Sequence, residues 1–182
     1  MHILIAFLRG VNMAGHNKIK MTDLASLFKK IGYKDAETFI QSGNVIFSDV
    51  NNLTSEEIVL KIEKTITKEF KYDIAVMIRT PEELQKIILN NPFAGEKNFD
   101  PAKMACLFLH ETPSELQISK MNDIDYPPDK FQISGSEIYI WCPNGFGRTK
   151  LYTNFFENKM KVKGTARNWK TITSLLEIAL KK

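Results

Sequence analysis

Three of the four arginines in this chain fall in polar loops at the ends of expected strands. These are Arg9, Arg148 and Arg167, with only Arg79 elsewhere, whereas the 21 lysines make lysine the usual base of the chain. A guanidinium group presents a planar fork of donors that fits a phosphate or a carboxylate, which a lysine ammonium cannot reproduce. Buried structural ion pairs also favour arginine. The pattern therefore indicates either an anionic ligand or internal ion pairs.

The loop Pro143–Lys150 carries the most chemistry of these segments. Gly147 and a second glycine let the backbone approach a ligand, and Thr149 is expected near the start of the following helix. Free N–H groups at a helix N-terminus attract anions, and Arg148 and Lys150 add positive charge there. The order of residues is not that of a Walker A loop. A tight strand-to-helix turn capped by Thr149 explains the same pattern equally well.

A second polar segment follows the first expected strand and runs from Arg9 to Lys18. Loops of this length in a compact lobe are often functional, and Asn12 and Lys18 supply hydrogen-bond donors. A histidine can act as an acid or a base, but a lone loop histidine is usually just exposed, so we assign His16 no catalytic role.

A hairpin turn and a late tryptophan complete the set of candidate ligand-binding residues. Ser42 and Asn44 belong to the turn, where Gly43 and Asn44 tolerate positive φ. In Thr165–Lys170, which is expected to open the last helix, Asn168 can cap the helix and Trp169 can stack on a base or pack in the core. Core packing of Trp169 is the favoured interpretation.

The elements that must position these residues follow the order βαββαβ in the first half of the chain. A buried strand at residues 3–8 precedes a helix near residues 22–31, with Thr22 as its expected cap. The remaining elements are strands at 37–40 and 45–47, a helix whose expected cap is Ser55, and an alternating strand at 72–78. This order is the ferredoxin-like arrangement.

The order repeats in the second half, with strands at residues 103–109, 131–134 and 138–142 and helices at 114–121, 150–160 and 168–180. No obvious final strand follows. The sequence therefore predicts an α+β protein with two ferredoxin-like lobes, the second atypical, and an extra C-terminal helix. We expect the lobes at residues 1–79 and 103–182, joined by a helical linker segment at 80–102.

Composition and motifs exclude several classes of protein. Two cysteines in apolar stretches and three histidines without ligand spacing predict no metal site, and the chain gives no sign of a cofactor. The apolar start is too short for a spanning helix and lacks the features of a signal peptide, which predicts a cytoplasmic protein without membrane association. No arrangement of nucleophile and base can be assigned, so the sequence does not decide whether the protein is an enzyme.

Several short motifs, in order, cover nearly the whole chain: residues 7–12, 18–21, 40–45, 91–93, 147–151 and 165–169. With these motifs the chain resembles the bacterial family called domain of unknown function 1697. The resemblance implies two ferredoxin-like lobes and brings no established reaction, cofactor or catalytic residue. The residue after Arg148 is commonly serine in that family, and Thr149 keeps the hydroxyl.

The sequence supports two main hypotheses on function. In the first, a phosphate-bearing small molecule binds between the lobes, with Arg9, Arg148, Lys150 and Arg167 meeting the anion while Asn12, Ser42 and Asn44 supply hydrogen bonds. In the second, the basic segment 148–170, with seven bases and one acid, binds RNA or DNA. Action through a protein partner is a third possibility, and the sequence carries no signal of oligomeric state.

Overall fold

The structure is a computed structural model that describes residues 2–13, 15–51 and 53–182. The chain divides into two compact units, of which the first contains Met1–Lys86 with Leu175–Lys182 and the second contains Ile87–Ser174. The boundaries of this division fall within two helices, α3 (Pro81–Leu89) and α6 (Trp169–Ala179). In the described part of the chain, no helix combines the length and the apolar character that crossing a membrane requires.

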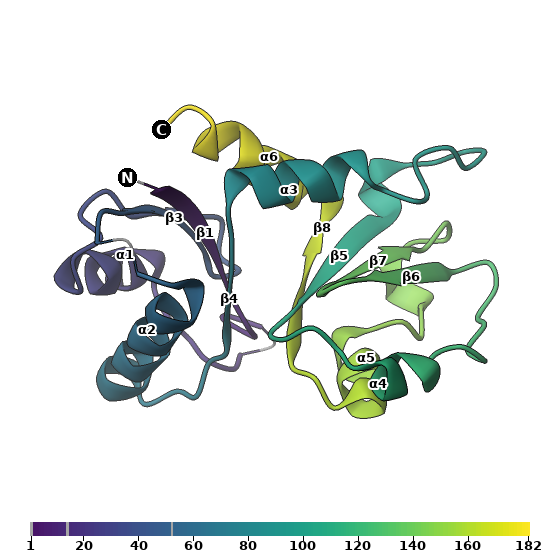
Figure 1. Ribbon diagram of the computed structural model, residues 1–182, viewed down its shortest axis with the longest axis horizontal. Helices are drawn as coiled ribbons and strands as arrows, with labels where there is room; N and C mark the ends of the chain where they lie inside the picture. Colours follow the sequence, from purple (N-terminus) through teal and green to yellow (C-terminus); the bar gives the residue numbers. More distant parts are fainter. Residues whose placement is uncertain (1, 14, 52) are drawn as a thin grey trace. The chain divides into compact units, whose positions relative to one another are not determined.

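The first lobe is a four-stranded antiparallel sheet with two helices on one face (Figure 1). In spatial order its strands are β2 (Glu37–Phe39), β3 (Asn44–Asp49), β1 (His2–Leu8) and β4 (Val76–Arg79). The helices are α1 (Met21–Lys30) and α2 (Ser55–Phe70). This is the predicted ferredoxin-like order, with β1 paired to β3 on one side and to β4 on the other.

The core of the first lobe lies between the sheet and the two helices. Leu4, Ala6 and Leu8 alternate along β1 toward the helices, because successive side chains of a strand point to opposite faces. The four-residue spacing of Ile58, Ile62 and Ile66 places all three on the buried face of α2.

Both predicted caps in the first lobe are wrong by one or two residues. The helix α1 begins at Met21 after Lys20, which makes no side-chain cap, so Thr22 lies inside the helix. The cap of α2 is Thr54 rather than Ser55. Thr54 Oγ1 accepts from the Glu57 N–H at 3.3 Å, and Glu57 Oε2 accepts from the Thr54 N–H at 2.8 Å. This reciprocal pair needs the spacing of three residues that Thr54 has and Ser55 lacks.

The second lobe repeats the same topology. In spatial order its strands are β6 (Lys130–Ser134), β7 (Glu137–Trp141), β5 (Met104–Leu109) and β8 (Gly164–Asn168). Its helices include α4 (Glu115–Ser119) and α5 (Thr153–Met160), and a 3-10 turn, η1 (Pro101–Lys103), precedes β5. The apolar core is formed by β5, β7 and the buried side of α5.

The expectation that the second lobe lacks a final strand is wrong. Residues 164–168, of which the last part is predicted as the start of the last helix, pair with β5 as β8. Their side chains alternate as a strand requires: Thr165 and Arg167 are buried on one face, and Ala166 packs into the core on the other.

Matching backbone hydrogen bonds relate the two lobes. Two bonds continue the pairing at the end of β1, and two equivalent bonds do so at the end of β5. At the end of β1, the Leu8 N–H donates to the Gly43 carbonyl (2.8 Å) and the Arg9 N–H to the Ala75 carbonyl (2.9 Å). At the end of β5, the Leu109 N–H donates to the Ser136 carbonyl (2.8 Å) and the His110 N–H to the Lys163 carbonyl (2.9 Å). The two lobes thus share the same backbone hydrogen bonds at these strand ends, although the residues at the equivalent positions differ.

The pairing of β8 with β5 depends on close approach at Gly164. A Cβ on this residue would lie 2.9 Å from Leu107 Cδ1 and 3.0 Å from the Phe108 carbonyl oxygen. A backbone oxygen cannot move away as the end of a flexible side chain can, so only glycine fits at this position.

We expect Gly164→Ala to destabilise the protein by about 1–3 kcal/mol, the usual cost of overpacking. For a chain of this size that corresponds to a fall in Tm of about 3–10 °C in a thermal melt. Gly95→Ala is the matched control, because its added Cβ meets no atom within 4 Å and its φ is not positive. Equal Tm values for the two variants would contradict the packing described for β8.

The Asp35 carboxyl is the acid of the first lobe with the most perturbed titration. Partial burial raises its pKa, but the Ser48 hydroxyl (2.6 Å), the Ser48 N–H (2.9 Å) and the Lys182 ammonium (2.9 Å) outweigh this effect and lower the pKa to about 2. Since the side chain is 41% exposed, solvent screens much of the interaction with Lys182.

A lowered pKa in the folded state means that Asp35 stabilises the fold above its unfolded pKa of about 4 and loses that contribution as the pH falls toward 2. We therefore expect Asp35→Asn to lose less stability than the wild type between about pH 4 and pH 2. Urea unfolding at a series of pH values measures the difference. Parallel curves for both proteins over this range would show that the Ser48 and Lys182 contacts do not hold the carboxylate.

Candidate functional site

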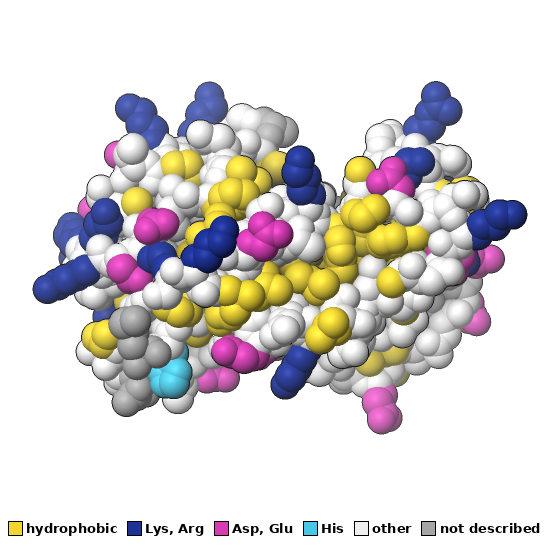
Figure 2. All heavy atoms as spheres, turned by 90° about the horizontal axis from the view of Figure 1, so that it is seen from above, with side chains coloured by type: hydrophobic (Ala, Val, Ile, Leu, Met, Phe, Trp, Pro, Cys, Tyr) yellow, Lys and Arg dark blue, Asp and Glu magenta, His cyan; other side chains and the backbone are white. Residues whose placement is uncertain are grey.

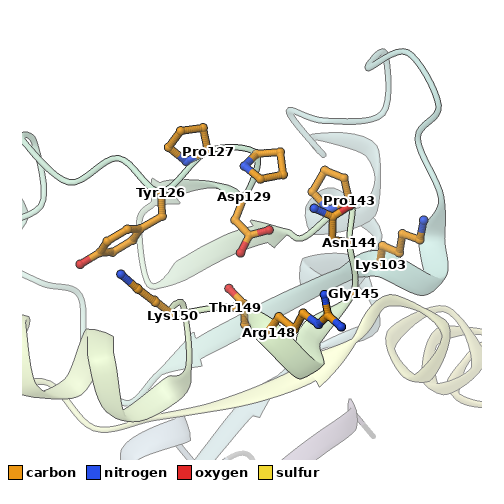
Figure 3. A pocket seen from close by; sticks show the side chains of 11 residues that line it. Lys103, Tyr126, Pro127, Asp129, Pro143, Asn144, Gly145, Arg148, Thr149 and Lys150 are labelled. Atoms are coloured by element: carbon orange, nitrogen blue, oxygen red, sulfur yellow. The ribbon is translucent and has the colours of Figure 1, made fainter.

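An open pocket of about 540 Å³ lies at one end of the second sheet (Figure 3). Its lining contains three cations, Lys103, Arg148 and Lys150, and Asp129 is the one acid among the residues that line it. The other lining residues are Tyr126, Pro127, Pro128, Pro143, Asn144, Gly145 and Thr149. The pocket is thus polar, with an excess of positive charge.

Strand register brings these residues together from distant parts of the sequence. The last paired row of the sheet aligns Lys130 of β6 with Trp141 of β7, and Trp141 with Met104 of β5. The residues just outside this row therefore also lie side by side. They are Asp129, Cys142 and Lys103, with the Cys142 N–H bonded to the Lys103 carbonyl at 2.9 Å. Tyr126 bridges back to Asp129 as an isolated pair.

The glycine loop after β7 supplies the other wall of the pocket. Gly145 takes a φ of 82° and closes a tight turn in which its N–H donates to the Cys142 carbonyl at 2.7 Å. The 3-10 turn η2 (Phe146–Arg148) follows. The expectation that a helix starts at Lys150 is wrong: the chain is extended at Thr149 and Tyr152, and α5 begins at Thr153. The cations of the loop, rather than a helix N-terminus, give this wall its positive charge.

Thr149 is the buried polar residue of the lining. Thr149 is 2% exposed, and its Oγ1 accepts from the Leu151 N–H at 3.0 Å, which holds the loop in its extended course. The Asp129 carboxyl and the Thr149 hydroxyl face each other across the pocket (Figure 3). Burial raises the pKa of the Cys142 thiol to about 11, and a hydrogen bond to Asp129 adds to the rise although one from Thr149 opposes it. The thiol therefore stays protonated and is no nucleophile at neutral pH.

The cations remain available to a ligand. Arg148 and Lys150 are exposed and Lys103 is half-buried. Lys150 Nζ lies 5.1 Å from the centre of the Tyr126 ring, a cation–π contact that orients the ammonium without neutralising it. Within the described residues 2–13, 15–51 and 53–182, none of the three makes an ion pair with a carboxylate.

Four predicted residues of the second lobe do not line this pocket: Gly147, Arg167, Asn168 and Trp169. Arg167 is 6% exposed, and its Nη1 donates to Thr165 Oγ1 at 2.6 Å and to the Ala166 carbonyl at 2.8 Å. Burial lowers the pKa of this guanidinium to about 9, so it is still charged at neutral pH.

Asn168 and Trp169 mark the start of α6. Asn168 Oδ1 accepts from the Thr171 N–H at 2.8 Å, which confirms the predicted cap. Trp169 is 5% exposed and its ring centre lies 6.2 Å from that of Tyr139. Core packing, the favoured interpretation of Trp169, is confirmed.

In the first lobe, the predicted polar side chains bind backbone groups. Asn12 Nδ2 donates to the carbonyls of Ile19 (2.8 Å) and Gln41 (3.0 Å), and its Oδ1 accepts from the Ile19 N–H (2.9 Å). Asn44 is fully buried and donates to the Phe39 carbonyl and to Ser42 Oγ, both at 3.0 Å. These side chains hold the two loops in shape.

Arg9 is half-buried at the end of β1, where its N–H donates to the Ala75 carbonyl. Lys18 is exposed and, with Asn12, lines a separate hollow of about 460 Å³ within the first lobe. A ligand-binding role for Arg9, Asn12, Lys18, Ser42 and Asn44 stays a prediction.

The features expected of a nucleic-acid module are weak. Phe7 and Phe47, the aromatics on the strands that carry base-stacking residues in RNA-binding modules, are both fully buried. On the face shown in Figure 2, Lys and Arg side chains are interspersed with Asp and Glu rather than gathered into one stripe.

Among the described residues, no group of three or more His, Cys, Asp or Glu side chains is placed to hold a metal ion.

Sequence reasoning missed five residues that line the pocket: Lys103 and the four residues of Tyr126–Asp129. The segment Tyr126–Asp129 contains two consecutive prolines, which mark a turn. That signal places a turn before β6 but does not identify the loop it will meet. Only the register of β6, β7 and β5 brings the turn next to the glycine loop.

Comparisons with known proteins agree with the fold. The structure is similar to that of the conserved bacterial protein SP0830 from Streptococcus pneumoniae, with a TM-score of 0.78 and 20% sequence identity over 100% of this chain and 99% of that one. No curated protein matches the chain. The model of a family described as protein of unknown function, DUF1697, matches residues 1–139. The chain belongs to the DUF1697 family.

Proposed function

We propose that this chain is a cytoplasmic protein that binds a phosphate-bearing small molecule, and that the pocket at the end of β5, β6 and β7 is its anion site. The observation that carries the proposal is the convergence of Lys103, Arg148 and Lys150 on one pocket that contains a single carboxylate, Asp129. Its volume of about 540 Å³ is that of a small-molecule site.

Two physical features favour a phosphate over other anions. Arg148 offers the planar fork that binds two oxygens of one phosphate, whereas the lysines supply point charges from either side. The turn at Gly145 brings the backbone itself to the pocket wall, because no side chain intervenes. A pocket of this kind distinguishes a compact, multiply charged group from a single carboxylate.

The nucleic-acid hypothesis has less support. Its basic segment includes Lys159, Lys161 and Lys163, which are exposed but do not line the pocket. Exposed lysines bind nucleic acid through counterion release, so such binding would weaken steeply with salt.

We expect phosphate compounds at about one hundred times their Kd to raise the stability of the protein by about 2.7 kcal/mol, a thermal shift of several degrees. The panel contains inorganic phosphate, sugar phosphates, nucleotides and short RNA and DNA oligomers. Arg148→Ala should weaken the binding of phosphate compounds about 10- to 100-fold, because it removes a charge-assisted hydrogen bond of about 1.5–3 kcal/mol. Isothermal titration calorimetry measures the change.

Lys159→Ala is the matched control, since it removes the same charge from an exposed position outside the pocket. It should leave phosphate affinity unchanged. Equal losses in both variants would indicate a long-range effect of net charge and contradict a site at Arg148. Binding of oligomers alone, abolished by salt, would replace the proposal with the nucleic-acid hypothesis.

A further inference from the structure

A second hollow of about 350 Å³ adjoins the anion pocket within the same lobe, and Asp129 lines both. Its character is different. Two half-buried apolar side chains, Ile124 and Phe131, share its lining with the acids Asp125 and Asp129, the Asn122 amide and a single base, Lys130. The two hollows therefore meet at one carboxylate, with cations on one side and a mixed apolar and acidic lining on the other.

The base of the second hollow is already engaged. Lys130 Nζ lies 2.6 Å from Glu96 Oε1 and 5.5 Å from the centre of the Trp141 ring. Phe93 stacks on the same ring, with a centroid separation of 6.1 Å and an interplanar angle of 26°. Phe93 is only 6% exposed, so Phe131 is the aromatic side chain of the lining that a ligand can meet. Apart from the Asn122 amide, the polar groups that the hollow offers a ligand are thus carboxylates, which accept hydrogen bonds and do not donate them.

Asp129 is an unexpected residue for an anion site, because a carboxylate repels a bare phosphate. Its position makes sense if the part of the ligand that reaches Asp129 is a hydrogen-bond donor. Hydroxyl groups of a sugar are such donors, and carboxylates bind ribose hydroxyls in other nucleotide sites. Across the two hollows a ligand thus meets the three cations first and the acceptor Asp129 next. Beyond Asp129 lie the apolar surface of Phe131 and a second acceptor, Asp125.

We infer that the ligand is a nucleotide-like phosphate ester. Its phosphate binds Lys103, Arg148 and Lys150, its hydroxyl-bearing portion binds Asp129, and a ring with an amino group lies in the second hollow. The inference rests on the proposed function, because it uses the same anion site. A ring stacked on an aromatic side chain, here the half-buried Phe131, contributes about 1–3 kcal/mol, which corresponds to about 5- to 150-fold in affinity.

The test compares the Kd values of inorganic phosphate, ribose 5-phosphate and adenosine monophosphate. We expect the affinity to rise along this series, with adenosine monophosphate at least tenfold tighter than inorganic phosphate. In Asp129→Asn, inorganic phosphate should bind several-fold more tightly because a like charge is removed. The ratio of the nucleotide affinity to the phosphate affinity should fall about tenfold, since the relief of repulsion is common to both ligands and cancels in the ratio.

Asp123→Asn is the control, because Asp123 is an exposed acid that lines neither hollow, and it should leave the ratio unchanged. If the three ligands bind with equal affinity, or if Asp129→Asn leaves the ratio unchanged, the nucleotide inference fails while the anion site stands. If inorganic phosphate and its esters all fail to bind, the proposed function fails and the inference fails with it.

Discussion

Each lobe depends on its first strand, which is hydrogen-bonded along both of its edges. In the first lobe β1 lies between β3 and β4, and in the second β5 lies between β7 and β8. Pairing on both edges fixes the register of three neighbouring strands at once, since a slip by one residue would turn every buried side chain to the wrong face. The register of the second lobe then determines which residues lie together where the strands end.

The two lobes use this shared geometry differently. In the first lobe, the amides of Asn12 and Asn44 turn inward and bind backbone carbonyls, which satisfies loop groups that would otherwise be costly to bury. In the second lobe, the strand ends leave Lys103, Arg148 and Lys150 around an open pocket. The same fold thus gives a loop held by internal hydrogen bonds in one lobe and a charged concave surface in the other.

Local patterns in the sequence were sufficient for most of the fold. The apolar run that forms β1 and the spacing of Ile58, Ile62 and Ile66 have only one reasonable interpretation. Residues 164–168 do not, because Thr165 and Asn168 suit a helix cap as well as an edge strand, and the contact that decides between them is between Gly164 and the distant β5. The candidate site divides in the same way. Arg148 and Lys150 were found from one loop, whereas Asp129 and Lys103 join it only through strand register.

The most direct test of the anion site is a titration of the isotopically labelled protein with inorganic phosphate, followed by backbone amide NMR. A phosphate site in this pocket predicts saturable shifts confined to the lining segments: Lys103, residues 126–129 and residues 143–150. Shifts centred on the exposed lysines Lys159, Lys161 and Lys163, or spread over both lobes without saturation, would contradict a phosphate site at the end of β5, β6 and β7.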